Sequence, residues 1–341
     1  MGLAELDRAH ERSVERSGPA EPPPGRARAV RVVGGRPWHD PDLDRAVDAV
    51  KARFPRPAVL VLAESRRDPE LRSVRVEALA KAAVGLSRGV EALVAEDSSN
   101  PDLWLWLGRT RLEEAWRIRP EARARAVQAG SYTTYTTSMQ AAREPLMRAA
   151  SLWPDDPVPW EAMLWYALGL GLDREEKDAL WTQASRRCAT LYGAHVARLV
   201  SLSPQWGGMT DEMFGFASSV MADASSEDPR AALVPLAYFE YFVQERSGII
   251  RGSSSWFSPE ERSDVENAAR CWFEGRRLHP RAIEAHNLFG AAFHLADMRR
   301  PARQHLLRTR GRPSSLPWTY LGGDGVSQYV KACRHLNVAT A

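Results

Sequence analysis

Residues 142–160, AREPLMRAASLWPDDPVPW, carry a spaced set of small, large and proline residues that returns later in the chain. Ala142, Leu146, Ala149, Pro154 and Trp160 follow one another at intervals of 4, 3, 5 and 6 residues. Residues 268–286, AARCWFEGRRLHPRAIEAH, repeat these intervals with Ala268, Trp272, Gly275, Pro280 and His286. Small residues let two antiparallel helices approach, bulky residues fill the space between them, and proline ends a helix. The pattern therefore predicts recurring hairpins of paired helices.

Helix starts are marked along the chain by a capping residue followed by proline. Such pairs occur at positions 40–41, 68–69, 100–101, 156–157, 228–229 and 258–259, and Glu261 adds a capping box to the last. Only Ala29–Val33 and Val59–Leu62 are candidate strands, and the second segment fits a buried helix equally well. We expect an all-α fold.

Two further segments extend this spaced pattern of small, large and proline residues. Residues 104–111 read Trp-x2-Leu-Gly-x2-Arg. The second copy of the spaced pattern, at 268–286, continues through Phe289-Gly290, Phe293, Ala302 and Leu306. These features resemble the tetratricopeptide repeat (TPR), a unit of two helices. The resemblance implies an αα-hairpin superhelix, or solenoid, in which neighbouring hairpins bury each other's apolar faces. It is close over 101–117, 142–169 and 259–309 and looser over 41–99 and 174–245. Arg111, Leu164 and His286 depart from the pattern, so we expect irregular repeats.

The predicted organisation is a leader, residues 1–36, followed by a TPR-like helical domain, residues 37–341. Residues 324–336 are amphipathic and are expected to form a C-terminal capping helix. Two insertions interrupt the repeats. One, of about 22 residues before Ala142, includes a Tyr/Thr-rich string at 131–138, and the other spans Arg246–Phe257. Insertions in solenoids either extend helices or lie on the binding face.

Composition excludes several classes of protein. The 341 residues hold 46 basic and 43 acidic side chains, and a net charge of +3 gives no case for nucleic acid. Three distant cysteines fit neither a disulfide framework nor a metal motif. No apolar run approaches the ~18–20 residues of a membrane helix, and the N-terminus is too charged for a signal peptide. The expected location is the cytoplasm, without membrane contact.

Motifs of catalysis and cofactor binding are missing from the sequence. It contains no GxSxG, no GxxxxGK[ST], no HExxH and no GxGxxG after a strand. His294 and Asp297 have a spacing that one ion could bridge, but no further ligand accompanies them. We therefore predict no catalytic residues, no cofactor and no metal.

The TPR resemblance implies that extended peptides or partner segments bind the concave surface formed by the first helices. The candidate ligand contacts lie next to the packing positions of the repeat pattern and are turned away from the second helix of each hairpin. They are Arg109, Glu161, Trp165, Asn287 and His294. Trp165 would be an aromatic anchor and Arg109 a carboxylate partner. The alternative is that these side chains pack against neighbouring helices.

Residues 203–213, SPQWGGMTDEM, resemble a turn and helix start in bacterial TPR-like proteins. Paired glycines Gly207 and Gly208 permit positive φ, Trp206 can pack across the turn, and Thr210 is the expected cap of the next helix. This segment is either a structural corner or an anion site at a helix start.

A run without acidic residues contains six arginines: Arg299, Arg300, Arg303, Arg308, Arg310 and Arg312. It would attract phosphates or an acidic protein, or would simply be a solvated face.

The leading functional expectation is a non-catalytic scaffold or adaptor that binds a protein or peptide, with self-association at exposed solenoid ends. The alternative is an enzyme or small-molecule-binding protein, with the Tyr/Thr-rich insertion as its lid and the Trp206 corner beside its pocket. A nucleic-acid-associated regulator that uses the arginine run ranks third, since nucleic acid is not an expected partner.

Overall fold

The computed structural model describes residues 31–118, 129–245, 256–272 and 278–339. All regular elements in these ranges are helices, which confirms the all-α prediction. The first group of helices is α2 (Pro41–Lys51), α3 (Arg56–Glu64), α4 (Pro69–Ala82), α5 (Ser87–Glu96) and α6 (Pro101–Arg117). The second is α7 (Ala129–Gln140), α8 (Arg143–Leu152), α9 (Val158–Leu170), α10 (Arg174–Ser185) and α11 (Tyr192–Ser201). The third is α12 (Thr210–Asp223), α13 (Leu233–Glu245), α14 (Pro259–Cys271), α15 (Ala282–Leu295), α16 (Arg299–Arg308) and α17 (Gly325–His335). Short 3-10 helices are η1 (Ser65–Arg67), η2 (Pro204–Trp206), η3 (Pro229–Ala232) and η4 (Trp318–Leu321).

Most predicted helix starts are confirmed. The side chains of Asp40, Asp68 and Asn100 accept hydrogen bonds from first-turn amides of α2, α4 and α6, and Ser258 forms the capping box of α14. Two starts differ in detail: α9 begins at position 158, and the pair at 228–229 opens η3, which leads into α13. The candidate strand Val59–Leu62 lies in α3, and residues 31–33 of the other candidate form no strand.

Residues of the spaced pattern lie where paired helices approach each other closely. A Cβ atom on Gly108 of α6 would lie 2.7 Å from Cγ of Leu146 in α8. Likewise, a Cβ on Gly290 of α15 would lie 2.5 Å from Cδ2 of Leu306 in α16. Because these glycines carry no side chain, each helix pair can approach closely around a buried leucine.

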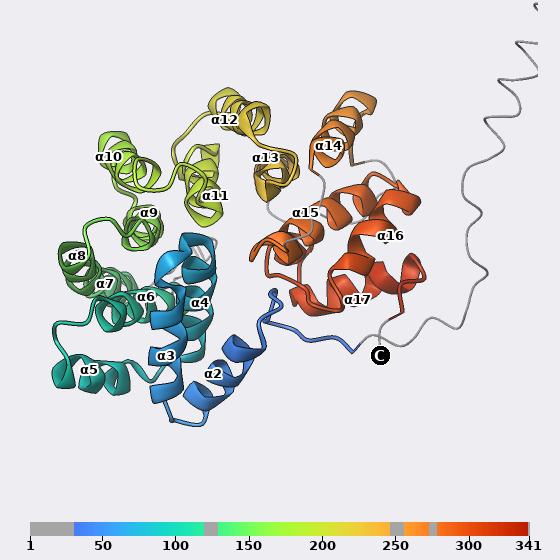
Figure 1. Cartoon of the computed structure of the whole chain (residues 1–341). Helices are drawn as coiled ribbons and strands as arrows, with labels where there is room; N and C mark the ends of the chain where they lie inside the picture. The colour runs from blue at the N-terminus through green and yellow to red at the C-terminus, as the bar shows by residue number, and fades with distance from the viewer. Residues whose placement is uncertain (1–30, 119–128, 246–255, 273–277, 340–341) are drawn as a thin grey trace, which may run out of the picture.

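The helices follow one another around a ring (Figure 1). The helices α9, α11, α13 and α15 lie on its inner side, α8, α10, α12, α14 and α16 lie outside them, and α4 lies in the interior. The N-terminal segment of the described chain meets its C-terminal part between α16 and η4, where the amide of Val33 donates to the carbonyl of Gly311 at 2.7 Å. Arg312 also forms an ion pair with Asp44 of α2 at 3.2 Å. Residues 31–36, the described part of the expected leader, therefore join the two ends.

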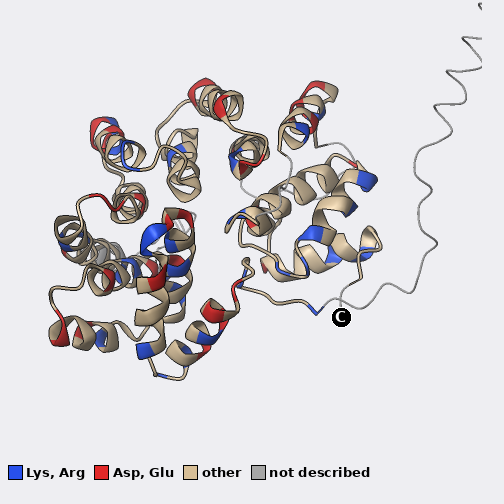
Figure 2. Cartoon of the chain, viewed as in Figure 1, with Lys and Arg blue, Asp and Glu red and all other residues tan. Residues whose placement is uncertain are grey.

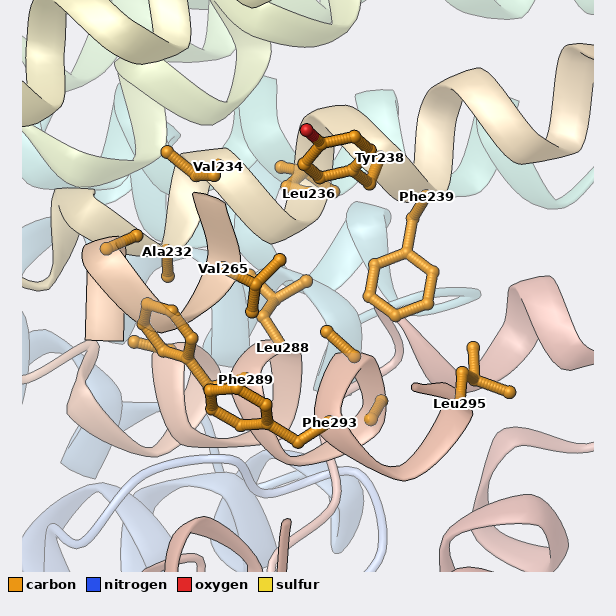
Figure 3. Close-up of a cluster of buried hydrophobic side chains, with 14 of the residues drawn as sticks. Ala232, Val234, Leu236, Tyr238, Phe239, Val265, Leu288, Phe289, Phe293 and Leu295 are labelled. Carbon is orange, nitrogen blue, oxygen red and sulfur yellow. The ribbon is translucent and has the colours of Figure 1, made fainter. Parts of the chain in front are cut away.

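The hydrophobic core follows the inner helices. One cluster, shown in part in Figure 3, joins α13, α14 and α15 through Phe239, Val265, Leu288 and Phe293. This cluster extends to α17, which lies within the segment 324–336 expected to form the capping helix. Tyr329 of α17 is buried in the cluster. A second cluster fills the space among α2 to α9.

The described part of the first insertion, from residue 129, forms α7. Tyr135 donates to the carbonyl of Gly169 at 2.8 Å, and Met139 is buried, so α7 packs against the helices beside it. Residues 119–128 and 246–255 of the insertions lie outside the described ranges.

Candidate functional site

One pocket of about 410 Å³ lies among the inner helices. Three of the five predicted groove residues line it: Arg109 of α6, and Glu161 and Trp165 of α9. The remaining walls come from α4, α11, η2, α13 and α15, from Arg281 just before α15, and from the segments 35–38 and 314–320. The pocket is thus assembled from segments spread over nearly the whole described chain.

Tryptophans form part of the pocket wall. Trp116, at the end of α6, meets Trp206 of η2 edge to face, with ring centroids 5.9 Å apart and planes at 74°. Trp38 lies on the N-terminal side, where its indole nitrogen donates to Asp44 at 3.0 Å. Together with Trp165, these rings give the pocket broad apolar faces whose π electrons attract cations.

Arg281 is the centre of a buried charged cluster at the pocket. Its side chain is only 3% exposed, and its Nη1 lies 2.8 Å from Glu77 Oε2 and 2.6 Å from Glu284 Oε1. Its Nη2 donates to Ser73 Oγ at 2.7 Å and lies 3.9 Å from Glu161 Oε1. Arg281 therefore joins α4 to the start of α15 across more than 200 residues of sequence.

Two more cations of the pocket are also ion-paired. Arg109 Nη2 lies 2.9 Å from Glu113 Oε1, one turn away on α6. Lys81 pairs with Glu77 on α4. Burial acts to raise the pKa of Glu77, but Lys81 and Arg281 outweigh it and hold that pKa well below its usual range.

Glu161 is a buried carboxyl group of the pocket with one oxygen that lacks a hydrogen-bond partner within the described part of the chain. It is 3% exposed, and its Oε2 accepts no hydrogen bond from the described residues. Burial raises its pKa, although Arg281 and Arg109 oppose that change. A Cβ on Gly193 would lie 2.2 Å from Glu161 Oε1, so the carboxylate fits against α11 only because position 193 is glycine.

Asn287 and His294 do not line this pocket. The Asn287 amide donates to the carbonyls of Ile283 and Arg312 at 2.8 and 3.0 Å and accepts from Trp318 at 2.7 Å. His294 packs edge to face on His335, and burial lowers its pKa to about 4. These two positions match the alternative expectation, packing against neighbouring segments.

The Trp206 corner is a tight turn. Gly207 has φ of 82°, and a Cβ on Gly208 would lie 2.1 Å from the carbonyl oxygen of Leu202. The predicted cap at Thr210 is wrong: Thr210 is the first residue of α12, and the cap position belongs to Met209, without a side-chain hydrogen bond. At Gly208 the turn brings the backbone against Leu202. The backbone carbonyl of Trp206 accepts from Lys177 at 2.9 Å.

The arginine run is divided between surface and interior. Arg299, Arg300, Arg303, Arg308 and Arg310 are exposed on or just after α16, where Figure 2 shows basic segments. Arg299 donates to the carbonyl of His335 at 2.7 Å. Arg312 belongs to the junction of the two chain ends, where it pairs with Asp44. None of the six lines the pocket.

Within the described ranges, no group of three or more His, Cys, Asp or Glu side chains has an arrangement that could hold a metal ion. His286, the last residue of the second copy of the spaced pattern, packs in the core. Its side chain is 3% exposed and its ring lies 4.5 Å from that of Trp272.

Sequence reasoning missed the contribution of α4 and Arg281. The helix α4 buries polar as well as apolar side chains on all sides, with Arg72 forming ion pairs with Asp102 and Asp156 at 2.7 and 2.8 Å. The sequence signal was the lack of a polar face in PELRSVRVEALAKA, which is unusual for a surface helix.

Comparison with known proteins gave no family-model match, no matching curated protein and no matching solved structure. Among the described residues, no helix has the length and apolar character needed to cross a membrane.

Proposed function

We propose that this chain is a non-catalytic binding protein of TPR-like architecture that takes one compact organic ligand into the pocket between its inner helices. The TPR-like architecture is part of the proposal. It is supported by the close approach at Gly108–Leu146 and Gly290–Leu306, and by the alternation of inner and outer helices in Figure 1.

The observation that carries the proposal is the set of buried polar atoms without partners around one pocket. Four side chains that line the pocket each have a polar atom without a hydrogen-bond partner among the described residues. These atoms are Glu161 Oε2, Arg109 Nε, Arg281 Nε and the Tyr192 hydroxyl oxygen. Buried polar groups in folded proteins are normally satisfied, so these four atoms are placed to form hydrogen bonds with a molecule bound in the pocket.

Size and lining favour a compact ligand over an extended peptide. A volume of about 410 Å³ falls in the range of small-molecule sites, which are mainly apolar with a few placed polar groups. Residues 35–38 and 314–316 line the same space, so the inner surface is bounded by the meeting chain ends. Asn287 and His294, which a long groove would use, are engaged elsewhere.

The experiment is native mass spectrometry of protein purified gently from its own cells, compared with a variant whose pocket is filled. Ala78 of α4 is buried and lines the pocket, so Ala78→Phe adds a ring there. Ala63 of α3 is exposed, so Ala63→Phe is the matched control. We expect a small molecule bound to the wild type and to the control but lost from Ala78→Phe, with circular dichroism showing all three proteins folded. Recovery of only a protein partner, captured equally by all three, would refute the proposal.

A further inference from the structure

We infer that the ligand of this pocket is an organic cation, an ammonium or guanidinium group on an apolar body, whose charged end binds beside Glu161. This inference rests on the proposed function and specifies the chemistry of the same site. Three features carry it: the excess of carboxyl groups, the unpaired oxygen of Glu161, and the tryptophan walls.

The charges that line the pocket do not balance. Five acidic residues line it, Glu77, Glu113, Glu161, Glu240 and Glu284, against three basic residues, Lys81, Arg109 and Arg281. Each basic residue already contacts a carboxylate: Glu77 for Lys81, Glu113 for Arg109, and both Glu77 and Glu284 for Arg281. An incoming anion would therefore have to compete with a resident glutamate for every cation, whereas an incoming cation would meet carboxylates in excess.

Glu161 is the carboxylate best placed to receive that cation. The ion pair that Glu161 forms with Arg281 is long, with Arg281 Nη2 3.9 Å from Glu161 Oε1, and Glu161 Oε2 has no hydrogen-bond partner among the described residues. Glu240, by comparison, accepts a hydrogen bond from the Tyr320 hydroxyl. A charged N–H donor at Glu161 would form a charge-assisted hydrogen bond in surroundings with little water.

The rest of the pocket suits the body of such a ligand. Apolar side chains from α4, α6, α11, α13 and α15 line it, including Val74, Leu112, Val196, Leu236 and Leu288. Trp38, Trp116, Trp165 and Trp206 add aromatic faces, which attract cations as well as apolar groups. The π faces of these rings would not attract an anion.

The test is isothermal titration calorimetry with three probes that share one skeleton: 4-phenylbutylamine, 4-phenylbutanol and 4-phenylbutanoate. The proteins are the wild type, Glu161→Gln, and the control Glu266→Gln, an exposed glutamate of α14. We expect the amine to bind the wild type at least about 10-fold more tightly than the alcohol, and the acid to bind most weakly. Loss of a hydrogen bond between charged groups should weaken amine binding by about 10- to 100-fold in Glu161→Gln and leave the alcohol unchanged.

Because glutamine has the same shape and removes a buried charge, Glu161→Gln should fold, and circular dichroism verifies it. Equal or tighter binding of the alcohol or the acid would overturn the inference while leaving the proposed function standing. So would an anionic or neutral molecule identified by native mass spectrometry. Failure of all three probes, together with an empty wild-type protein in native mass spectrometry, would reject the proposed function itself.

Discussion

Replacing Arg281 with methionine should destabilise the protein strongly, because one side chain neutralises the buried cluster that joins α4 to α15. Methionine keeps the apolar stem and removes the guanidinium. The loss leaves Glu284 and Glu161 without their close cation and breaks the hydrogen bond to Ser73. Removal of one partner from a buried ion pair costs about 3–5 kcal/mol of unfolding free energy, and we expect Arg281→Met to fall in that range.

The loss should also depend on pH. Burial already raises the pKa of Glu161 and of Glu284, and Arg281 opposes that rise in both. Without Arg281 both pKa values rise further, and a carboxyl group whose folded pKa is raised stabilises the fold at low pH and loses that contribution as pH rises. The deficit of Arg281→Met should therefore be smaller at pH 5 than at pH 8.

Urea unfolding followed by tryptophan fluorescence and circular dichroism measures this effect. Arg300 of α16 is exposed, so Arg300→Met should change the unfolding free energy by no more than about 0.5 kcal/mol. A cost below about 1 kcal/mol for Arg281→Met, or a cost independent of pH, would show that Arg281 is not the neutralising centre of a buried cluster.

Two further predictions concern α11 and its surroundings. Gly193→Ala should lower the unfolding free energy by about 1–3 kcal/mol, because its Cβ would lie 2.2 Å from Glu161 Oε1. Gly215→Ala in α12 is the control, because no atom lies within 4 Å of the added Cβ, and it should stabilise the protein by about 0.5–1 kcal/mol. Similar effects of the two substitutions in urea titrations would contradict the close packing at Gly193. Glu70 accepts from the amide of Tyr192 at 2.8 Å, and burial raises its pKa to about 8. The contribution of Glu70 to the free energy of unfolding is therefore present at low pH and lost as pH rises from about 4.5 toward 8. In Glu70→Gln the free energy of unfolding should decline less over this range. Identical pH profiles for the wild type and Glu70→Gln would contradict the prediction.

Local features of this protein could be predicted from the sequence. Capping residues before proline located the starts of α2, α4, α6 and α14, because these signals act within one helical turn. Arg109, Glu161 and Trp165 could be selected from their positions beside the packing slots, and all three reach the pocket. The cap expected at Thr210 was wrong by one residue, because α12 includes Thr210 and its cap position is Met209.

The tertiary structure alone decided how the charged groups meet. Arg281 and Ser73 are separated by 208 residues, and their contact depends on the accumulated rotation from each helix to the next. No periodicity within a helix encodes that sum, so the sequence could not place Arg281 beside α4 or show that the chain ends meet through Arg312 and Asp44. The sequence determined the helices and the residues at which pairs approach, because these depend on neighbours within a turn or a hairpin. The pocket and the position of Glu161 in its wall depend on contacts between distant segments, which exist only in the folded ring.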